Sequence, residues 1–445
     1  MKRGRVLIAV AAAALLAGGT IPAPTAPAAP LRFTAPVRVS PELSEAWEPV
    51  LLVDRFDNIF MHARKATTNL VVAPDPGSPT QTRSMSWVWR SSDGGRTFGP
   101  MPGLPLNAEN HDWGYEGDFA MDDAGHLYFV DQMYADSNIT RWTVTGRGAA
   151  TMDFHRPFIP TAQPIEDRPW LAAHGDGVLF YAVNAGDSLL NPTGRDGGDA
   201  YGPGRYSVYR STDAANTFEP VGHSLRDSGG CRPAADHRPG SRLVYLACTN
   251  DAGKVLAFVS EDDGATYARH TIGSYNANAD TFDWPLVTVG ENGDVWVLHI
   301  DADQVEQTGD GFQILTNRLN LYRSADKGRT WSRQDITPNA GRYRWGWIVA
   351  SPSGNLALAI QHRPSKTSPW HAYAAIFSPG SVPVLSPVDT TPVDDASRPE
   401  PPSEMTAVAF TGEGTLAVAW TRIESVQGQR FRRVYFARSI APSSA

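Results

Sequence analysis

Three stretches of the chain repeat one turn pattern: Ser91-Ser-Asp93-Gly-Gly95-Arg-Thr97-Phe98, Ser260-Glu-Asp262-Asp-Gly264-Ala-Thr266-Tyr267 and Ser324-Ala-Asp326-Lys-Gly328-Arg-Thr330-Trp331. A weaker copy at 211–218 keeps Asp213 but has Ala215 where the others have Gly. The Asp carboxylate can accept hydrogen bonds from backbone N–H groups of its own turn. Glycine supplies a positive φ without steric cost. We therefore expect structural roles for Asp93, Asp213, Asp262 and Asp326.

A second repeat is a β-hairpin, clearest at residues 282–298, where two alternating strands flank Asn292-Gly293. Equivalent turn residues recur at a spacing of about 60 residues, a usual size for a four-stranded propeller blade. They are Asp57, Gly125, Gly177, Gly240, Gly293, Gly354 and Gly414. With many Gly and Pro and few charges, this pattern predicts an all-β, seven-bladed β-propeller of four-stranded antiparallel blades, with residues 29–445 as one domain.

The last predicted blade has strands near 404–411, 415–422 and 432–439 and lacks a fourth. Residues 33–40 precede the first hairpin and have no other partner. We expect them to complete the last blade, so that the N-terminal strand closes the ring and few strand edges stay open.

The N-terminus has the pattern of an export signal. Lys2, Arg3 and Arg5 precede a short apolar run at 6–17, and Ala26-Pro27-Ala28 fits a cleavage site. We expect residues 1–28 to be a signal peptide, the alternative being a retained N-terminal anchor. No later segment has the apolar length of a membrane span. The formal net charge of -8 without a basic stretch argues against nucleic acid as a partner. A secreted monomer is expected.

The two cysteines, Cys231 and Cys248, should pair in an oxidising compartment. If His237 faces Arg242 across a hairpin turn, counting back along both strands puts the cysteines opposite each other. Directly opposed residues of antiparallel strands lie within disulfide reach. The alternative is two free thiols in the core.

The start of each first strand should line the mouth of the central channel. Ten residues before each turn residue lie the lead positions, Trp47, Tyr115, Asp167, Gly230, Asp283, Arg344 and Glu404. Their next neighbours are Glu48, Glu116, Arg168, Cys231, Trp284, Trp345 and Met405. Polar groups that converge in a concave site are typical of polar-ligand binding. The alternative is a solvated channel without a function of its own.

No metal or cofactor is predicted. The segment 184–205 contains Asp187, Asp196 and Asp199, whose carboxylates are of the kind that bind Ca²⁺, but an EF-hand spacing is missing. A plain loop is the favoured interpretation. The histidines show no zinc spacing, and no G-x-S-x-G motif indicates a serine hydrolase.

The repeated turn resembles the Asp-box, S-x-D-x-G-x-T-[FWY], and the whole mature chain is similar to the sialidase superfamily. The resemblance implies a six-bladed propeller as the alternative to seven blades. It also implies an arginine triad, a Tyr–Glu pair and an acidic Asp. The segment that matches the first triad motif is Ala46-Trp47-Glu48-Pro49, and Trp47 stands where the family has Arg. Tryptophan cannot form a bidentate ion pair with a carboxylate. Seven-bladed Asp-box propellers occur among xyloglucan-degrading hydrolases and among binding proteins.

Two hypotheses follow for a protein that acts on an extracellular glycan or glycoconjugate. The first is a glycoside hydrolase with Asp167, Asp283 and Glu404 as catalytic candidates, which predicts two carboxylates about 5–10 Å apart in an open cleft. The second is a non-catalytic module for glycan or protein, which predicts exposed aromatics and carboxylates paired with Arg. Substrate-binding candidates in either case are Trp47, Glu48, Tyr115, Glu116, Arg168, Arg232, Trp284, Arg344 and Trp345.

Overall fold

The computed structural model describes residues 30–40, 45–64, 86–104, 116–133, 136–158, 166–185, 206–221, 225, 228–279, 283–308, 311–394 and 400–441. The predicted signal peptide, Tyr115 and the carboxylates of 187–199 lie outside these residues. Strand β11 contains the backbone of Asp167, but its side chain is not among those described. None of the described helices has the length and apolar character of a membrane span.

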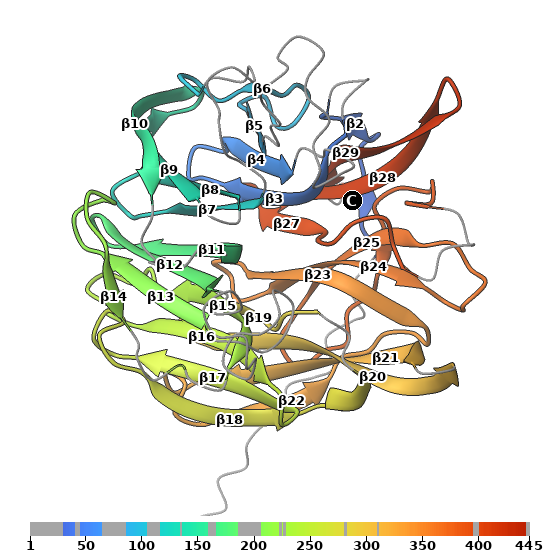
Figure 1. Ribbon diagram of the computed structural model, residues 1–445. Helices are drawn as coiled ribbons and strands as arrows, with labels where there is room; N and C mark the ends of the chain where they lie inside the picture. The colour runs from blue at the N-terminus through green and yellow to red at the C-terminus, as the bar shows by residue number, and fades with distance from the viewer. Residues whose placement is uncertain are drawn as a thin grey trace, which may run out of the picture.

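Seven antiparallel sheets are arranged around a centre, so the seven-bladed prediction is confirmed and the six-bladed alternative is wrong (Figure 1). Blade 1 comprises β3 (Trp47–Val53), β4 (Ile59–Arg64), β5 (Ser86–Ser91) and β6 (Gly99–Pro100). Blade 2 comprises β7 (Glu116–Met121), β8 (His126–Met133), β9 (Asp136–Gly146) and β10 (Ala149–Phe158). Blade 3 comprises β11 (Glu166–His174), β12 (Val178–Ala185), β13 (Tyr206–Ser211) and β14 (Glu219–Val221).

Blade 4 comprises β15 (Gly229–Ala235), β16 (Val244–Asn250), β17 (Lys254–Ser260) and β18 (Ala268–Ser274), followed by the 3₁₀ turn η1 (Ala277–Ala279). Blade 5 comprises β19 (Leu286–Val289), β20 (Val295–Thr308), β21 (Gly311–Ser324) and β22 (Ser332–Asp335). Blade 6 comprises β23 (Arg342–Ala350), β24 (Leu356–Arg363), β25 (His371–Phe377) and β26 (Ser386–Pro387). Blade 7 contains β27 (Ala407–Phe410), β28 (Leu416–Val426) and β29 (Gln429–Ile440).

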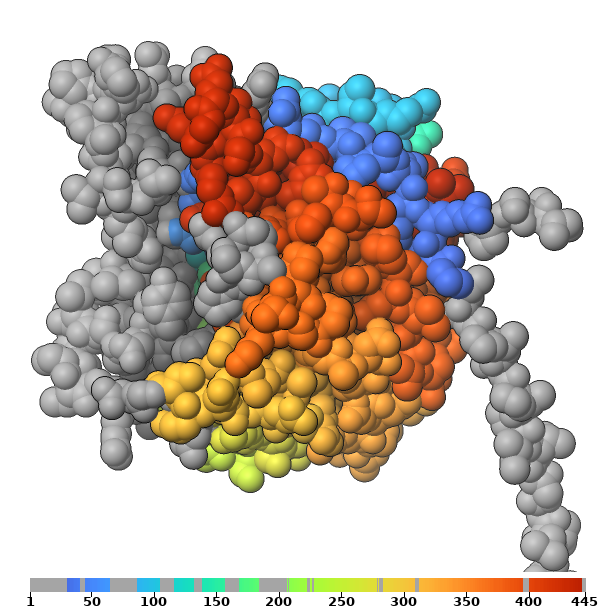
Figure 2. Space-filling model, turned by 90° about the vertical axis from the view of Figure 1, so that its right-hand side faces the viewer, coloured from blue at the N-terminus to red at the C-terminus, as the bar shows by residue number. Residues whose placement is uncertain are grey.

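The N-terminal strand closes the ring. Strands β1 (Arg32–Phe33) and β2 (Val37–Arg38) both pair antiparallel with β29, the third strand of blade 7. The blue N-terminal residues accordingly lie against the red and orange C-terminal part of the surface (Figure 2). The two ends of the chain thus share one sheet, as the missing fourth strand predicted.

The hairpin turns lie where the repeat predicts them. All seven turn residues have a positive φ, from 58° at Asp57 to 97° at Gly125. Glycine tolerates this backbone region, which explains why six of the seven turn residues are glycines. The first strand of each blade therefore runs from the channel mouth to these turns, and we call the two ends the mouth end and the turn end.

The Asp turns join the third and fourth strands at the turn end. In the first copy Asp93 Oδ1 accepts hydrogen bonds from the backbone N–H groups of Arg96 and Thr97 at 2.9 and 3.0 Å, and Oδ2 accepts one from Thr97 Oγ1 at 2.7 Å. The same Asp-to-Thr bonds recur at Asp213, Asp262 and Asp326. These bonds keep the pKa of Asp326 low, at about 2. These four aspartates therefore hold their own turns.

The glycine of each complete turn also lets neighbouring blades approach closely. A Cβ on Gly264 would lie 2.6 Å from Phe180 of blade 3, and one on Gly328 would lie 2.6 Å from Val259 of blade 4. The side chains of five tryptophans are almost fully buried: Trp142, Trp170, Trp296, Trp370 and Trp420.

The disulfide between Cys231 and Cys248 is confirmed, with an S–S distance of 2.02 Å and a Cα–Cα distance of 4.1 Å. Strands β15 and β16 pair in the predicted register, with Ala235 opposite Val244 and Arg232 opposite Ala247. Both cysteines are fully buried in blade 4.

Candidate functional site at the channel mouth

A repeated backbone irregularity shapes the mouth. The first strands of blades 1, 3, 4 and 6 each contain a shift in register at their start. Within these shifts Glu48, Arg168, Gly230 and Trp345 have φ values of 52–57°. A β-bulge redirects side chains, and a positive φ is costly for residues other than glycine. Three bulky side chains thus adopt a strained backbone at equivalent points of the ring.

Blade 4 differs from the predicted alignment by one residue. Gly230, and not Cys231, has the conformation of Arg168 and Trp345. Gly230 lies ten residues before its turn residue Gly240, whereas Arg168 lies nine before Gly177, so the hairpin of blade 4 is one residue longer.

Arg168 lies at the centre of the mouth, because its side chain meets residues from four other blades. Its guanidinium forms ion pairs with Glu48 of blade 1 at 3.2 Å and Glu116 of blade 2 at 3.4 Å, and also contacts Glu404, which precedes blade 7. It also lies 4.7 Å from the ring centre of Trp284, which precedes blade 5. The Arg168 side chain is only 4% exposed.

Arg64, at the end of β4, is a second cation in this group. It lies 3.4 Å from both Glu48 and Glu116. We call Glu48, Arg64, Glu116, Arg168 and Glu404 the Arg168 network. Buried charges are tolerated when they are paired and hydrogen-bonded, and this network links blades 1, 2, 3 and 7.

A parallel network lies on the other side of the mouth. Arg344 Nε is 3.0 Å from Asp283 Oδ2, and Asp283 Oδ1 accepts a hydrogen bond from the backbone N–H of Trp345 at 2.6 Å. Arg342 and Arg344 both contact Glu400. The Asp283 side chain is 3% exposed, whereas that of Glu400 is 48% exposed. Asp283 therefore holds the strained backbone of Trp345 in place.

Aromatic rings form a layer beneath and beside these charges. Trp284 and Trp345 are half-buried, and their ring centres are 5.6 Å apart. The guanidinium of Arg232 lies between the rings of Trp170 and Trp347, at 3.8 and 3.9 Å from their centres. We call Trp170, Arg232 and Trp347 the septum, because they lie deeper in the channel than the Arg168 network.

The pKa values of three acidic groups at the mouth shift in different directions. Burial, together with the nearby Glu48 and Glu116, raises the pKa of Glu404 to about 7 despite Arg168. Burial also acts on Glu48, but Arg168 and Arg64 outweigh it and lower the pKa of that carboxyl. Burial raises the pKa of Asp283 to about 6 although Arg344 opposes it. The pKa values of Glu48 and Glu404 thus shift in opposite directions, although both carboxyls contact the Arg168 guanidinium.

The structure brings together most of the candidates from the sequence: Glu48, Glu116, Arg168, Trp284, Arg344, Trp345 and Glu404 in the mouth, with Asp283 and Arg232 buried beneath it. Trp47 is buried between the guanidinium groups of Arg64 and Arg432 and donates a hydrogen bond to Glu48 at 3.1 Å. It therefore orients Glu48.

Sequence reasoning missed Arg64, Arg342, Glu400 and the septum tryptophans. Arg342 carries a signal that could have been used: it lies two residues before Arg344 on one strand, so both side chains lie on the same face. Glu400 lies four residues before Glu404 in the segment that leads into blade 7. The partners of these residues come from other blades, which spacing does not reveal.

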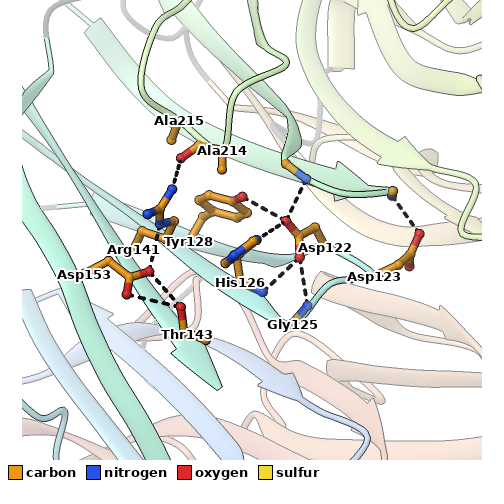
Figure 3. Close-up of polar contacts among 12 residues, drawn as sticks. Asp122, Asp123, Gly125, His126, Tyr128, Arg141, Thr143, Asp153, Ala214 and Ala215 are labelled. Carbon is orange, nitrogen blue, oxygen red and sulfur yellow. Dashed lines mark hydrogen bonds and ion pairs between the residues drawn. The ribbon is translucent and has the colours of Figure 1, made fainter. Parts of the chain in front are cut away.

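One group of potential metal ligands occurs among the described residues, at the turn end. Ligand atoms of Asp122, His126 and Asp176 lie within 4.8 Å of one another. However, Asp122 already accepts five hydrogen bonds, from the backbone N–H groups of Gly125, His126 and Gly177, the His126 ring and the Tyr128 hydroxyl (Figure 3). A cation would have to displace these donors. We interpret Asp122 as a link between blades 2 and 3.

No protein-family model matches the sequence, and no curated protein matches it. Among solved structures, the chain is similar to a protein of unknown function from Dyadobacter fermentans, with 12% identity, a TM-score of 0.47 and coverage of 92% of this chain and 99% of the other. It is also similar to an α-L-arabinanase from Penicillium chrysogenum, with 12% identity, a TM-score of 0.41 and coverage of 92% and 98%. A Trypanosoma rangeli sialidase mutant with trans-sialidase activity has 12% identity, a TM-score of 0.46 and coverage of 80% and 60%. Such values do not assign an activity.

Proposed function

We propose that the channel mouth is a glycan-binding site of a secreted propeller. The proposal rests on the half-buried pair Trp284 and Trp345, which lies beside the two partly exposed carboxylates Glu400 and Glu404. Aromatic faces suit the C–H faces of sugar rings, and fixed polar groups can bind hydroxyls. Each of the two carboxylates contacts at least one arginine, so the acceptors are held in position before a ligand arrives.

Binding is favoured over hydrolysis because the described mouth is closely packed. The cavity lined by Glu48, Glu116 and Arg168 measures only 10 Å³. Each described carboxylate of the two networks is paired with arginine, as the binding hypothesis predicts. Export is part of the proposal, because residues 1–28 have the signal pattern and a buried disulfide suits an oxidising compartment.

Binding is tested on a glycan array with the purified protein and with W345A. Loss of the ring should weaken binding at least tenfold, since aromatic stacking would be removed. The matched control is W331A, which removes a tryptophan of an Asp turn away from the mouth and should leave binding unchanged. Equal binding by W345A and the unaltered protein would refute the site.

Glycoside hydrolysis is the second candidate. It is favoured because the pKa of Glu404 is raised and that of Glu48 is lowered, while both carboxyls contact the Arg168 guanidinium. A protonated and an ionised carboxyl are what an acid and its partner require. In this case E404Q should reduce turnover of an aryl glycoside panel by at least a hundredfold while array binding persists. The exposed Glu413, in the turn of blade 7, supplies the control E413Q. Binding without turnover on any glycan would leave the binding module as the function.

A further inference from the structure

The central channel widens at the turn end, on the far side of the septum from the glycan site. Two cavities of 510 and 810 Å³ lie there and share wall residues, among them Leu52, Val53, Val289 and Val349. We call this combined space the funnel. Among the described residues, none of the Arg168 network lines it. The two ends of the channel therefore differ in chemistry.

The funnel wall carries apolar side chains that are only half-buried. Val53, Met121, Val289, Val349 and Phe410 come from blades 1, 2, 5, 6 and 7 and each keeps part of its surface accessible. They give the funnel accessible apolar area beside polar groups, and accessible apolar area in a concavity is typical of a ligand pocket. The volumes fall in the range of about 300–1,000 Å³ that is usual for ligand pockets.

The septum forms the floor of the funnel. Trp347 lines the smaller cavity with part of its surface and packs against the Arg232 guanidinium at 3.9 Å. The ring centre of Trp170 lies 3.8 Å from the same guanidinium. A ligand in the funnel would thus meet tryptophan at its inner end.

Hydrogen bonds between blades fix the rim of the funnel. Asp122 holds its own turn and the neighbouring turn at Gly177, and Asp123 accepts a hydrogen bond from Gly175 N–H at 2.7 Å (Figure 3). The second oxygen of Asp123 lies 2.8 Å from His237 Nδ1 of blade 4. The rim is therefore set before a ligand binds, which lowers the entropic cost of binding.

Arg55 is a cation of this rim. It lines both cavities and is exposed, and its guanidinium lies 5.0 Å above the Phe56 ring. Within the described chain no carboxylate forms an ion pair with it. Asp123, by contrast, is occupied by His237 and Gly175, and Asp236 by Arg238 and Ser241. Glu291 is an exposed anion that lines only the larger cavity.

We propose that the funnel binds a free fatty acid, with its alkyl chain against the apolar wall and its carboxylate beside Arg55. The chain reaches toward Trp347, and the head group stays at the rim in contact with water. This site is independent of the glycan site, because the septum lies between them.

The first test is a series of saturated fatty acids from octanoate to tetradecanoate, each below its micellar concentration, titrated into the full chain by calorimetry. Burial of each methylene should raise affinity about fourfold, equivalent to about 0.8 kcal/mol, until the chain fills the funnel. Affinity that is independent of chain length would overturn the proposal. Brominated fatty acid should quench tryptophan fluorescence, and quenching that is undiminished in W347F would overturn the placement of the chain.

Two variants locate the site. V289D places a charge on the shared wall and should reduce dodecanoate affinity at least tenfold, whereas V305D, the same change at an exposed position of β20, should not. R55Q is an exposed change that should leave folding intact and weaken dodecanoate about threefold, but not the uncharged dodecyl maltoside. Unchanged dodecanoate binding by folded V289D would overturn the proposal. So would a dimer in sedimentation that V289D dissociates, since the funnel would then be covered by a second copy.

Discussion

The Asp turn at 260–267 and the channel mouth around Arg168 lie at opposite ends of the blades, and both depend on fixed carboxylates. At the turn, Asp262 bonds only within its own eight residues, and the same bonds recur at three other turns. At the mouth, Arg168 contacts glutamates of three other blades that lie far from it in the sequence. The Asp turn is held by bonds within one blade, whereas the channel mouth is held by contacts between blades.

The largest expected difference between the two regions is at Arg168. R168M would leave Glu48 and Glu116 buried beside one fewer cation, so we expect the free energy of unfolding to fall by about 3–5 kcal/mol. The control is R329M, whose partner Glu261 lies at the turn end and whose own side chain is 62% exposed, with that of Glu261 54% exposed. That change should cost at most about 1 kcal/mol. Urea unfolding of both variants makes the measurement, and similar losses would show that the Arg168 network contributes no more than a surface pair.

Blade 4 allows a second comparison, because it has the Cys231–Cys248 disulfide near the mouth, where other blades have ion pairs. The double variant C231S/C248S opens a loop with a sequence separation of 17 residues. We expect a loss of about 3 kcal/mol in the chain-entropy model. Urea unfolding of the variant is compared with that of the oxidised protein, and a loss below about 1 kcal/mol would contradict the expectation.

The carboxyls of the channel mouth and of the Asp turns should make stability depend on pH in opposite directions. The mouth carboxyls Glu404 and Asp283 have raised pKa values of about 7 and 6, so the folded chain keeps protons that the unfolded chain releases from about pH 4 upward. Stability should therefore fall as pH rises from about 4 to 7. Below pH 4 the lowered pKa of Asp326 acts the other way, and stability should fall as pH decreases. The maximum is expected near pH 4–5.

Melting temperatures from pH 3 to 8 measure this profile. E404Q cannot ionise at position 404 and should lose less stability between pH 5 and 7.5 than the unaltered protein. E413Q, at an exposed turn, should follow the unaltered profile. Identical slopes for all three proteins would remove Glu404 as a source of the effect.

The smallest expected effect concerns the incomplete Asp turn. Ala214 and Ala215 have positive φ values of 56° and 66°. A215G should relieve the backbone and stabilise the fold by up to about 1 kcal/mol, less the loss of a buried methyl group. G264A should destabilise, because its Cβ would lie 2.6 Å from Phe180. The melting temperatures of A215G and G264A are compared with that of the unaltered protein. A higher melting temperature for G264A would contradict the structural role of glycine in the complete Asp turn.

The repeat in the sequence was enough to predict the fold. The two periodic signals, the Asp turn and the hairpin, located seven blades, the closing strand and the disulfide, because each depends on contacts within one blade or on counting blades. The mouth was predictable in position and only partly in composition. Counting back from the turns reached Arg168 and Glu404, but the one-residue difference in blade 4 and the partners Arg64 and Glu400 depend on how blades meet. Those contacts join residues far apart in the chain and follow no period.

The pairing of β1 and β2 with β29 has a consequence for how the molecule is made. Residues 32–38 are synthesised long before their partner at 429–440. The ring cannot close until β29 has been made, and until then blade 1 and blade 6 each lack a complete neighbour. Removal of β1 and β2 should accordingly loosen blade 7, because strands made early and late in synthesis hold each other in one sheet.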